Sequence, residues 1–124
     1  ENIIKHSFFA VSKSGTISLE ICKYEVPSII IYKMNPINFF FIKRMVKTKF
    51  ANIINIINQK EIIPELLQSE CNSKEIFNSV NYFIQKPEMI KKQQELVKRT
   101  VKSMQNDELS SLNAANIVLN YINN

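Results

Sequence analysis

Short apolar runs and segments with helical spacing alternate along the first third of the chain. Residues 8–12 form an apolar run that ends at a Ser/Gly turn, and residues 28–32 form a β-branched run after Pro27, so each predicts a buried strand. Between them, residues 15–24 place apolar side chains at helical spacing and predict a helix. The resulting pattern is strand, helix, strand.

Helical patterns dominate the rest of the chain. Pro36 suits the first turn of a helix that runs to about residue 46. The apolar run 51–57 is expected to be a third strand followed by a loop, and residues 64–68 a short helical turn. From Ser73, a fair N-cap, three helices are predicted: one up to the break at Pro87, one from 88 to about 105, and one from about 111.

Strands that alternate with helices and form continuous apolar runs predict a parallel sheet with helices packed on it. The 124 residues suit one domain with its own core. The helical tail is unusual for half of a doubly wound unit and suggests helices that wrap the sheet or reach toward a partner domain. Because the sequence begins with Glu1 rather than Met, we expect a fragment of a longer protein.

Composition excludes several classes of protein. An apolar content of 45% is too high for a disordered chain. The sequence contains no run of 18 apolar residues, so no membrane-spanning helix is predicted. Cys22 and Cys71 are too few for a disulfide scaffold and fit a reducing cytosol, and no signal peptide is visible.

The net charge of +5 is unevenly placed. Residues 33–49 contain no acidic residue, and they combine the run Phe39–Phe40–Phe41 with five basic residues: Lys33, Lys43, Arg44, Lys47 and Lys49. Two interpretations stay open: a buried helix with a solvated basic end, or a surface for phosphate groups or an anionic membrane. Nucleic acid is disfavoured, because the aromatic residues are consecutive and not interleaved with arginine.

The turn at residues 14–16 is the strongest candidate for a binding site. It follows a predicted strand and opens a helix, where free backbone N–H groups and the helix dipole favour an anion, and it holds Gly15, the sole glycine. Hydroxyls of Ser14 and Thr16 add donors, and Glu20 lies one turn further along the helix. The plainer alternative is that Gly15 is a turn residue, Ser14 an N-cap, and Glu20 a partner of Lys23.

Catalytic constellations are scarce. His6 is the sole histidine and Asp107 the sole aspartate, so neither a metal site of ordinary composition nor a Ser–His–Asp triad is supported. Glu61 and Glu65 are four residues apart and are expected on an exposed surface. The residues alone therefore predict an α/β domain with an anion site and a basic, apolar patch.

A set of motifs in fixed order between about residues 8 and 80 extends this picture. They are Ser14-Gly15-Thr16-x-x-Leu19-Glu20, Val26-Pro27, Tyr32-Lys33-Met34-x-Pro36, Lys43-Arg44-x-Val46-Lys47, Asn55, and Glu65-Leu66-Leu67-Gln68. In these residues the chain resembles the C-terminal part of lipid-A-disaccharide synthases. The resemblance implies an α/β, Rossmann-like fold: the nucleotide-sugar donor half of a GT-B glycosyltransferase, with residues 1–72 in the donor-binding domain and 73–124 as C-terminal helices on the sheet or on the missing N-terminal domain.

The resemblance also implies roles for single residues, matched by position. Those expected to contact the UDP donor are Ser14, Gly15 and Thr16 near the phosphates, Glu20 at the ribose hydroxyls, Lys33, Asn55, and Gln68 lining the cleft. Contact with the membrane or acyl chains is expected from the aromatic and basic segment itself, since the implied substrates carry acyl chains; the residues are Phe39, Phe40, Lys43, Arg44 and Lys47. The chain departs from the family pattern at Ile54, usually Pro, at Gln59, commonly Gly, and at Lys13, usually small.

The implied reaction is an inverting transfer in which 2,3-diacylglucosamine 1-phosphate attacks UDP-2,3-diacylglucosamine and releases UDP. The general base would come from the missing N-terminal domain, so no catalytic residue is expected here and the fragment alone should be inactive. Neither a cofactor nor a metal is expected, and the implied location is the cytoplasmic face of the inner membrane, with homo-oligomerisation left open. The alternative is a non-catalytic interaction module that uses residues 33–49.

Overall fold

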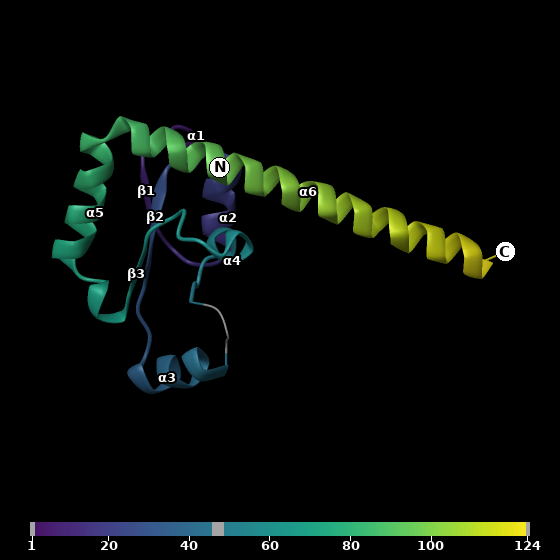
Figure 1. The fold of residues 1–124 in the computed structure, drawn as a ribbon, viewed down its shortest axis with the longest axis horizontal. Helices are drawn as coiled ribbons and strands as arrows, with labels where there is room; N and C mark the ends of the chain where they lie inside the picture. Colours follow the sequence, from purple (N-terminus) through teal and green to yellow (C-terminus); the bar gives the residue numbers. More distant parts are fainter. Residues whose placement is uncertain (1, 46–48, 124) are drawn as a thin grey trace.

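The centre of the fold is a three-stranded parallel sheet (Figure 1). A computed structural model describes residues 2–45 and 49–123, and side chains up to residue 107. The strands are β1 (Ala10–Lys13), β2 (Ser28–Tyr32) and β3 (Glu65–Leu67), in the order β1-β2-β3. The predicted α/β, Rossmann-like fold with a parallel sheet and flanking helices is therefore confirmed.

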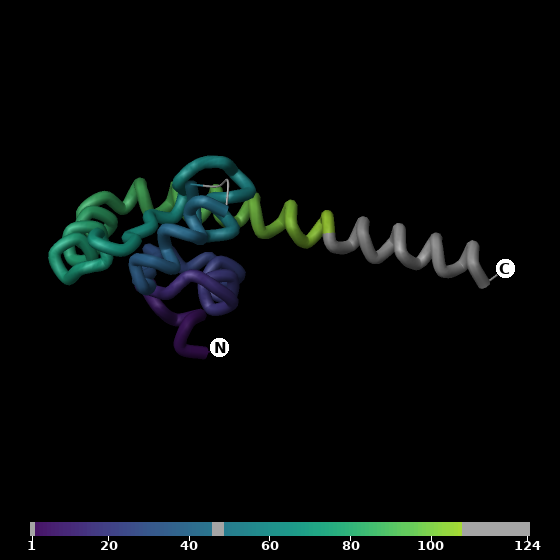
Figure 2. The backbone as a smooth tube through the Cα atoms, turned by 90° about the horizontal axis from the view of Figure 1, so that it is seen from below, coloured from purple at the N-terminus to yellow at the C-terminus, as the bar shows by residue number. Residues whose placement is uncertain are grey.

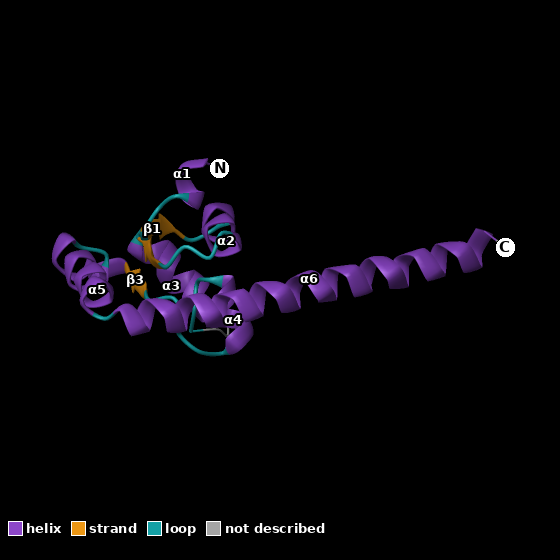
Figure 3. Cartoon of the chain, turned by 90° about the horizontal axis from the view of Figure 1, so that it is seen from above, coloured by secondary structure: helices purple, strands orange, loops and turns teal. Residues whose placement is uncertain are grey.

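Helices cover both faces of this sheet. Figure 1 shows α5 on one side of the strands and α2 and α4 on the other, and Figures 2 and 3 keep α5 and α2 on opposite sides. The long helix α6 packs against α2, α4 and α5. The bounds are α1 (Asn2–Lys5), α2 (Thr16–Lys23), α3 (Pro36–Met45), α4 (Ile53–Asn58), the 3-10 turn η1 (Gln68–Glu70), α5 (Ser73–Gln85) and α6 (Pro87–Asn123).

The central strand β2 organises the core. Ile29 and Ile30 are fully buried on opposite faces of the sheet, as expected for a strand covered on both sides. On the α2 side, Ile30 belongs to a cluster with Cys22, Ile54, Ile62, Ile63 and Val97. Burial raises the pKa of the Cys22 thiol to about 11, so this side chain is a neutral core residue at physiological pH.

Side-chain amides fasten α6 to the sheet. Gln93 is buried and binds both backbone groups of Ser28: its Oε1 accepts from Ser28 N at 2.7 Å and its Nε2 donates to Ser28 O at 3.0 Å. Gln94 Nε2 donates to the carbonyl of Glu25 at 2.9 Å. The first turns of α6 therefore lie at the amino ends of the strands.

The predicted strand at 51–57 is wrong, because this segment contains α4. Asn52 caps the helix by accepting from Ile54 N at 2.9 Å, and Gln59 ends it in a left-handed conformation with φ 50°. Asn55 and Asn58 lie three residues apart, and both side-chain amides form hydrogen bonds inside the fold. Two inward-facing residues at this spacing fit one face of a helix rather than the alternation of a strand.

The predicted helical turn at 64–68 is also wrong. Residues Glu65–Leu67 form β3, paired with the end of β2. The two helices predicted at 88–105 and from 111 are one helix, since no Gly or Pro interrupts 88–123. The first strand begins at Ala10 rather than residue 8, and Phe9 packs on Phe83 with ring centroids 5.4 Å apart.

Candidate functional site

The candidate site lies at the carboxyl ends of the parallel strands. The turn at residues 14–16 follows β1, Lys33 follows β2, and Gln68 follows β3. Parallel strands end at one edge of the sheet, which is where α/β proteins bind their ligands. The structure therefore brings five of the predicted site residues to this edge: Ser14, Gly15, Thr16, Lys33 and Gln68.

Gly15 gives the turn a shape that other residues rarely adopt. Its φ of 130° and ψ of −157° belong to a region of the backbone map that is essentially restricted to glycine. A Cβ built on Gly15 meets no atom within 4 Å, so the space beside the turn is open. The first helical bond of α2 runs from Ser18 N to Gly15 O at 3.1 Å. The amides of Thr16 and Ile17 precede that bond, which is the arrangement that attracts an anion.

Ser14 fixes the turn against the neighbouring loop. Its hydroxyl donates to the carbonyl of Ala51 at 3.1 Å, and Gly15, not Ser14, is the N-cap of α2. The N-cap alternative for Ser14 is therefore wrong. Its hydroxyl proton is used inside the protein, while its oxygen lone pairs remain as acceptors. The turn and the start of α4 are thus held side by side.

A buried carboxylate holds the segment before α4. Glu65 Oε2 accepts from Ala51 N at 2.8 Å, and its Oε1 accepts from Asn52 N at 2.7 Å and Asn55 Nδ2 at 2.9 Å. Glu65 is 8% exposed, so the expectation that it lies on an open surface with Glu61 is wrong for Glu65. The amides of Ala51 and Asn52, just before α4, already have an acidic partner, whereas the amides of Thr16 and Ile17 precede the first backbone bond of α2 beside an open turn.

Asn55 belongs to the same internal network. It is fully buried, and its amide makes four bonds: Nδ2 donates to Ile63 O and Glu65 Oε1, and Oδ1 accepts from Ile62 N and Ile63 N at 2.8 and 2.9 Å. These bonds use the full capacity of the side chain. Asn55 is therefore linked to the loop at 51–52 through Glu65, which it holds and which binds Ala51 N and Asn52 N.

Gln68 joins the ends of β2 and β3. Its Oε1 accepts from Met34 N at 2.8 Å and its Nε2 donates to Met34 O at 3.1 Å, while its own backbone has a positive φ of 53°. These two hydrogen bonds hold the loop that follows β2, and the exposed Lys33 belongs to this loop. Gln68 thus shapes the edge of the candidate site through the backbone of Met34.

Two charged side chains flank the Gly15 turn. Lys13, immediately before it, places its ammonium 5.1 Å from the ring centroid of Tyr32. Glu20 is partly exposed on α2, one turn beyond Thr16. Among the side chains described up to residue 107, Glu20 forms no ion pair with Lys23, so it stands available to a ligand.

Four of the five predicted membrane-contact residues lie on α3: Phe39, Phe40, Lys43 and Arg44. This helix has no buried residue, and its large apolar side chains are open: Ile37 at 66%, Phe40 at 59%, Phe41 at 58% and Met45 at 82% exposure. Lys43 stacks over the Phe39 ring and Arg44 over the Phe40 ring. Within the described part of this chain, α3 is therefore exposed and packs no side chain into the core. Lys47 lies outside the described residues.

The buried position of Glu65 and the structural role of Asn55 were not predicted from the sequence. The available signal was the spacing of Asn52, Asn55 and Asn58, which places three amides along one short helix. The resemblance to lipid-A-disaccharide synthases matched Asn55 by position, but position alone does not show which way a side chain points.

The fold and this edge define a class: a Rossmann-like α/β protein with a glycine turn before a helix N-terminus. Within that class the chain belongs to the lipid-A-disaccharide synthetase family, whose model matches residues 1–119. The resemblance predicted from the motifs is confirmed.

The curated relatives carry the same name. The chain is 36% identical to the lipid-A-disaccharide synthase of Sulfurihydrogenibium sp. (strain YO3AOP1) over 82% of this chain and 26% of the relative. It is 46% identical to that of Rickettsia conorii over 57% of this chain and 16% of the relative. With the enzyme of Rhodospirillum centenum it shares 30% identity over 91% of this chain and 28% of the relative. The chain thus spans about a quarter of these relatives or less.

Proposed function

We propose that this chain is the donor-binding part of a lipid-A-disaccharide synthase, a glycosyltransferase that joins UDP-2,3-diacylglucosamine to 2,3-diacylglucosamine 1-phosphate and releases UDP. The observation that carries the proposal is the open Gly15 turn at the carboxyl edge of the sheet, in a chain of this family. Amides at the start of α2 would bind the diphosphate, and Lys13 and Lys33 would add positive charge.

The reaction would be an inverting transfer. The acceptor's 6-hydroxyl attacks the anomeric carbon, the bond to the UDP oxygen breaks, and a base removes the hydroxyl proton. We assign that base to a further, N-terminal domain, with residues 1–72 as the donor-binding unit and 73–124 as the helices that complete it. On this proposal the 124-residue chain binds UDP but catalyses no transfer.

A UDP titration of the chain, followed by backbone amide NMR, tests the proposal. We expect saturable shifts centred on Gly15, Thr16 and Ile17, at the open turn. Inorganic diphosphate should shift the same amides with lower affinity, because it lacks the ribose and uracil. A lack of saturable shifts, or shifts centred away from these amides, would contradict the donor-site assignment.

Glu20→Ala tests the contact to the ribose. We expect UDP affinity to fall by about 1.5–3 kcal/mol, the range for a hydrogen bond to a charged group. Deoxyuridine diphosphate should lose less on this mutation, because one of its hydroxyls is already missing. Lys23→Ala, on the same helix, is the matched control and should leave UDP binding unchanged. Equal losses for both nucleotides would remove Glu20 from the ribose site.

We further propose that α3 contacts an anionic membrane surface or the acyl chains of the substrates. Exposed aromatic side chains beside Lys43 and Arg44 suit the boundary between headgroups and acyl chains. No helix in the described part of the chain has the length and apolarity to cross a membrane. On this proposal, α3 would contact the cytoplasmic face of the inner membrane.

Vesicle binding by variants of α3 tests this membrane contact. Lys43→Glu should weaken binding to anionic vesicles by about 2 kcal/mol, since each charge contributes about 1 kcal/mol, and Phe40→Ser should weaken it through lost apolar burial. Lys74→Glu and Phe77→Ser are matched controls, because both residues are exposed but lie on α5. Equal binding by all four variants would instead favour the alternative, an interaction module in which residues 33–49 dock on a protein.

A further inference from the structure

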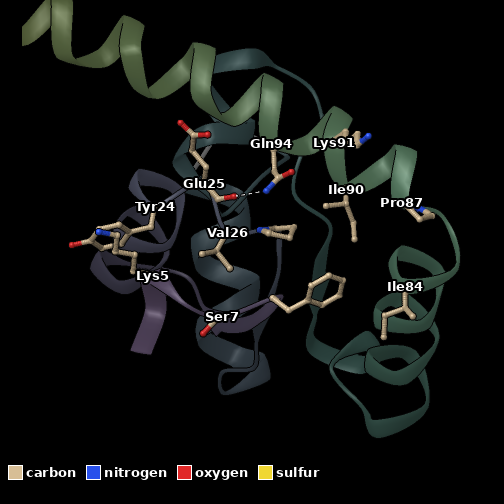
Figure 4. Close-up of a pocket in the computed structure, with 12 residues that line it drawn as sticks. Lys5, Ser7, Tyr24, Glu25, Val26, Ile84, Pro87, Ile90, Lys91 and Gln94 are labelled. Carbon is tan, nitrogen blue, oxygen red and sulfur yellow. Dashed lines mark hydrogen bonds between the residues drawn. The ribbon is translucent and has the colours of Figure 1, made fainter. Parts of the chain in front are cut away.

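A second concave surface lies at the opposite edge of the sheet from the Gly15 turn. It is a groove of about 490 Å³ between the N-terminal segment and the corner where α5 meets α6 (Figure 4). Val26 and Pro27, which precede β2, form its floor. Since these residues precede a strand whereas the Gly15 turn follows one, the groove is separate from the candidate donor site.

The groove is lined mainly by apolar side chains. Phe8 is 70% exposed and Ile84 is 54% exposed, although both lie in a concave surface of a folded domain. Pro87 and Ile90 continue the apolar lining along the start of α6 (Figure 4). Exposed apolar side chains gathered in a groove are typical of a binding site rather than of ordinary protein surface.

The charges around the groove are positive. Figure 4 shows Lys5 and Lys91 on opposite sides of Val26. Among the side chains described up to residue 107, neither lysine has a carboxylate partner. Glu25 also lines the groove, but its carboxylate lies 3.0 Å from Lys98 Nζ and pairs with that ammonium group. An occupant with an apolar body and a negative charge would therefore complement both the floor and the sides.

We propose that this groove binds an acyl chain that carries an anionic headgroup. The apolar floor would bury the chain, and Lys5 or Lys91 would pair with the carboxylate or phosphate of the headgroup. The volume falls within the range of small-molecule sites. This proposal rests on the groove alone and not on the donor site, and α3, whose apolar side chains are also exposed, follows the opposite end of β2.

Amide NMR titrations of the chain with decanoate, decyl phosphate and decyltrimethylammonium, each below micelle-forming concentration, test the proposal. Decanoate and decyl phosphate separate a carboxylate source from a phosphate source, and the ammonium compound reverses the charge. We expect saturable shifts for the anions at Val26, Ile90 and Gln94, and at least about tenfold weaker binding of the cation. UDP at saturation should leave these affinities unchanged.

Variants of the groove complete the test. The double variant Lys5→Glu/Lys91→Glu should weaken anion binding about tenfold or more, and Ile84→Ser should weaken all three amphiphiles. The matched control is the double variant Lys74→Glu/Lys102→Glu, which changes the net charge by the same amount but at exposed positions outside the groove. The proposal is overturned if the shifts centre on α3, if no saturable shift occurs, or if both double variants bind the anions equally.

Discussion

Gly15→Val is expected to weaken UDP binding by this chain about a hundredfold. Valine is strained at a φ of 130°, and its side chain would occupy the open space next to the amides of Thr16 and Ile17. Loss of two hydrogen bonds to a charged diphosphate would cost about 3 kcal/mol, roughly a hundredfold in affinity. Calorimetry of the variant with UDP gives the measurement.

The control for this experiment has to separate two effects of valine: the strain at a positive φ, and the occupation of the space proposed for the phosphates. Gln59→Val places the same side chain at another positive φ, 50°, in the C-cap of α4. It should lower the free energy of unfolding but leave UDP affinity unchanged. Unchanged affinity in a folded Gly15→Val protein would remove the turn from the site.

The local parts of this fold were predictable from the sequence, because their signals are local. Gly15 marks the turn before α2, and Pro27 marks the end of the connection to β2, so the first strand–helix–strand unit was identified correctly. The run at 51–57 has no such marker. Short Ile-rich segments fit either a strand or a buried helix, and here bonds to distant groups favour the helix.

The candidate site also has one part that was predictable from the sequence and one part that was not. The Gly15 turn is encoded by adjacent residues, and the sequence placed it at the end of a strand. The support beneath it depends on Glu65, thirteen residues from its partner Asn52. Glu65 lies within reach of Asn52 because β3 pairs with β2, so residue types and spacing gave no indication that this carboxylate is buried.

Asn55→Leu is expected to give the largest loss of stability of any substitution considered for this chain. Leucine has a similar size but leaves Ile62 N, Ile63 N and the Glu65 carboxylate short of partners in a buried position. Each unsatisfied buried group costs about 1–3 kcal/mol, so the free energy of unfolding should fall by about 3–5 kcal/mol. Urea unfolding followed by circular dichroism gives the value.

The matched control is Asn78→Leu, which makes the same change at an exposed position of α5 and should alter stability by no more than about 0.5 kcal/mol. Because Asn55 supports the loop at 51–52, to which Ser14 is bonded, a folded Asn55→Leu protein should also bind UDP more weakly, with the amide shifts of the Gly15 turn altered before ligand is added. If Asn55→Leu is as stable as Asn78→Leu, the four bonds of Asn55 do not hold the loop. If stability falls but UDP affinity stays, the network supports the core without shaping the donor site.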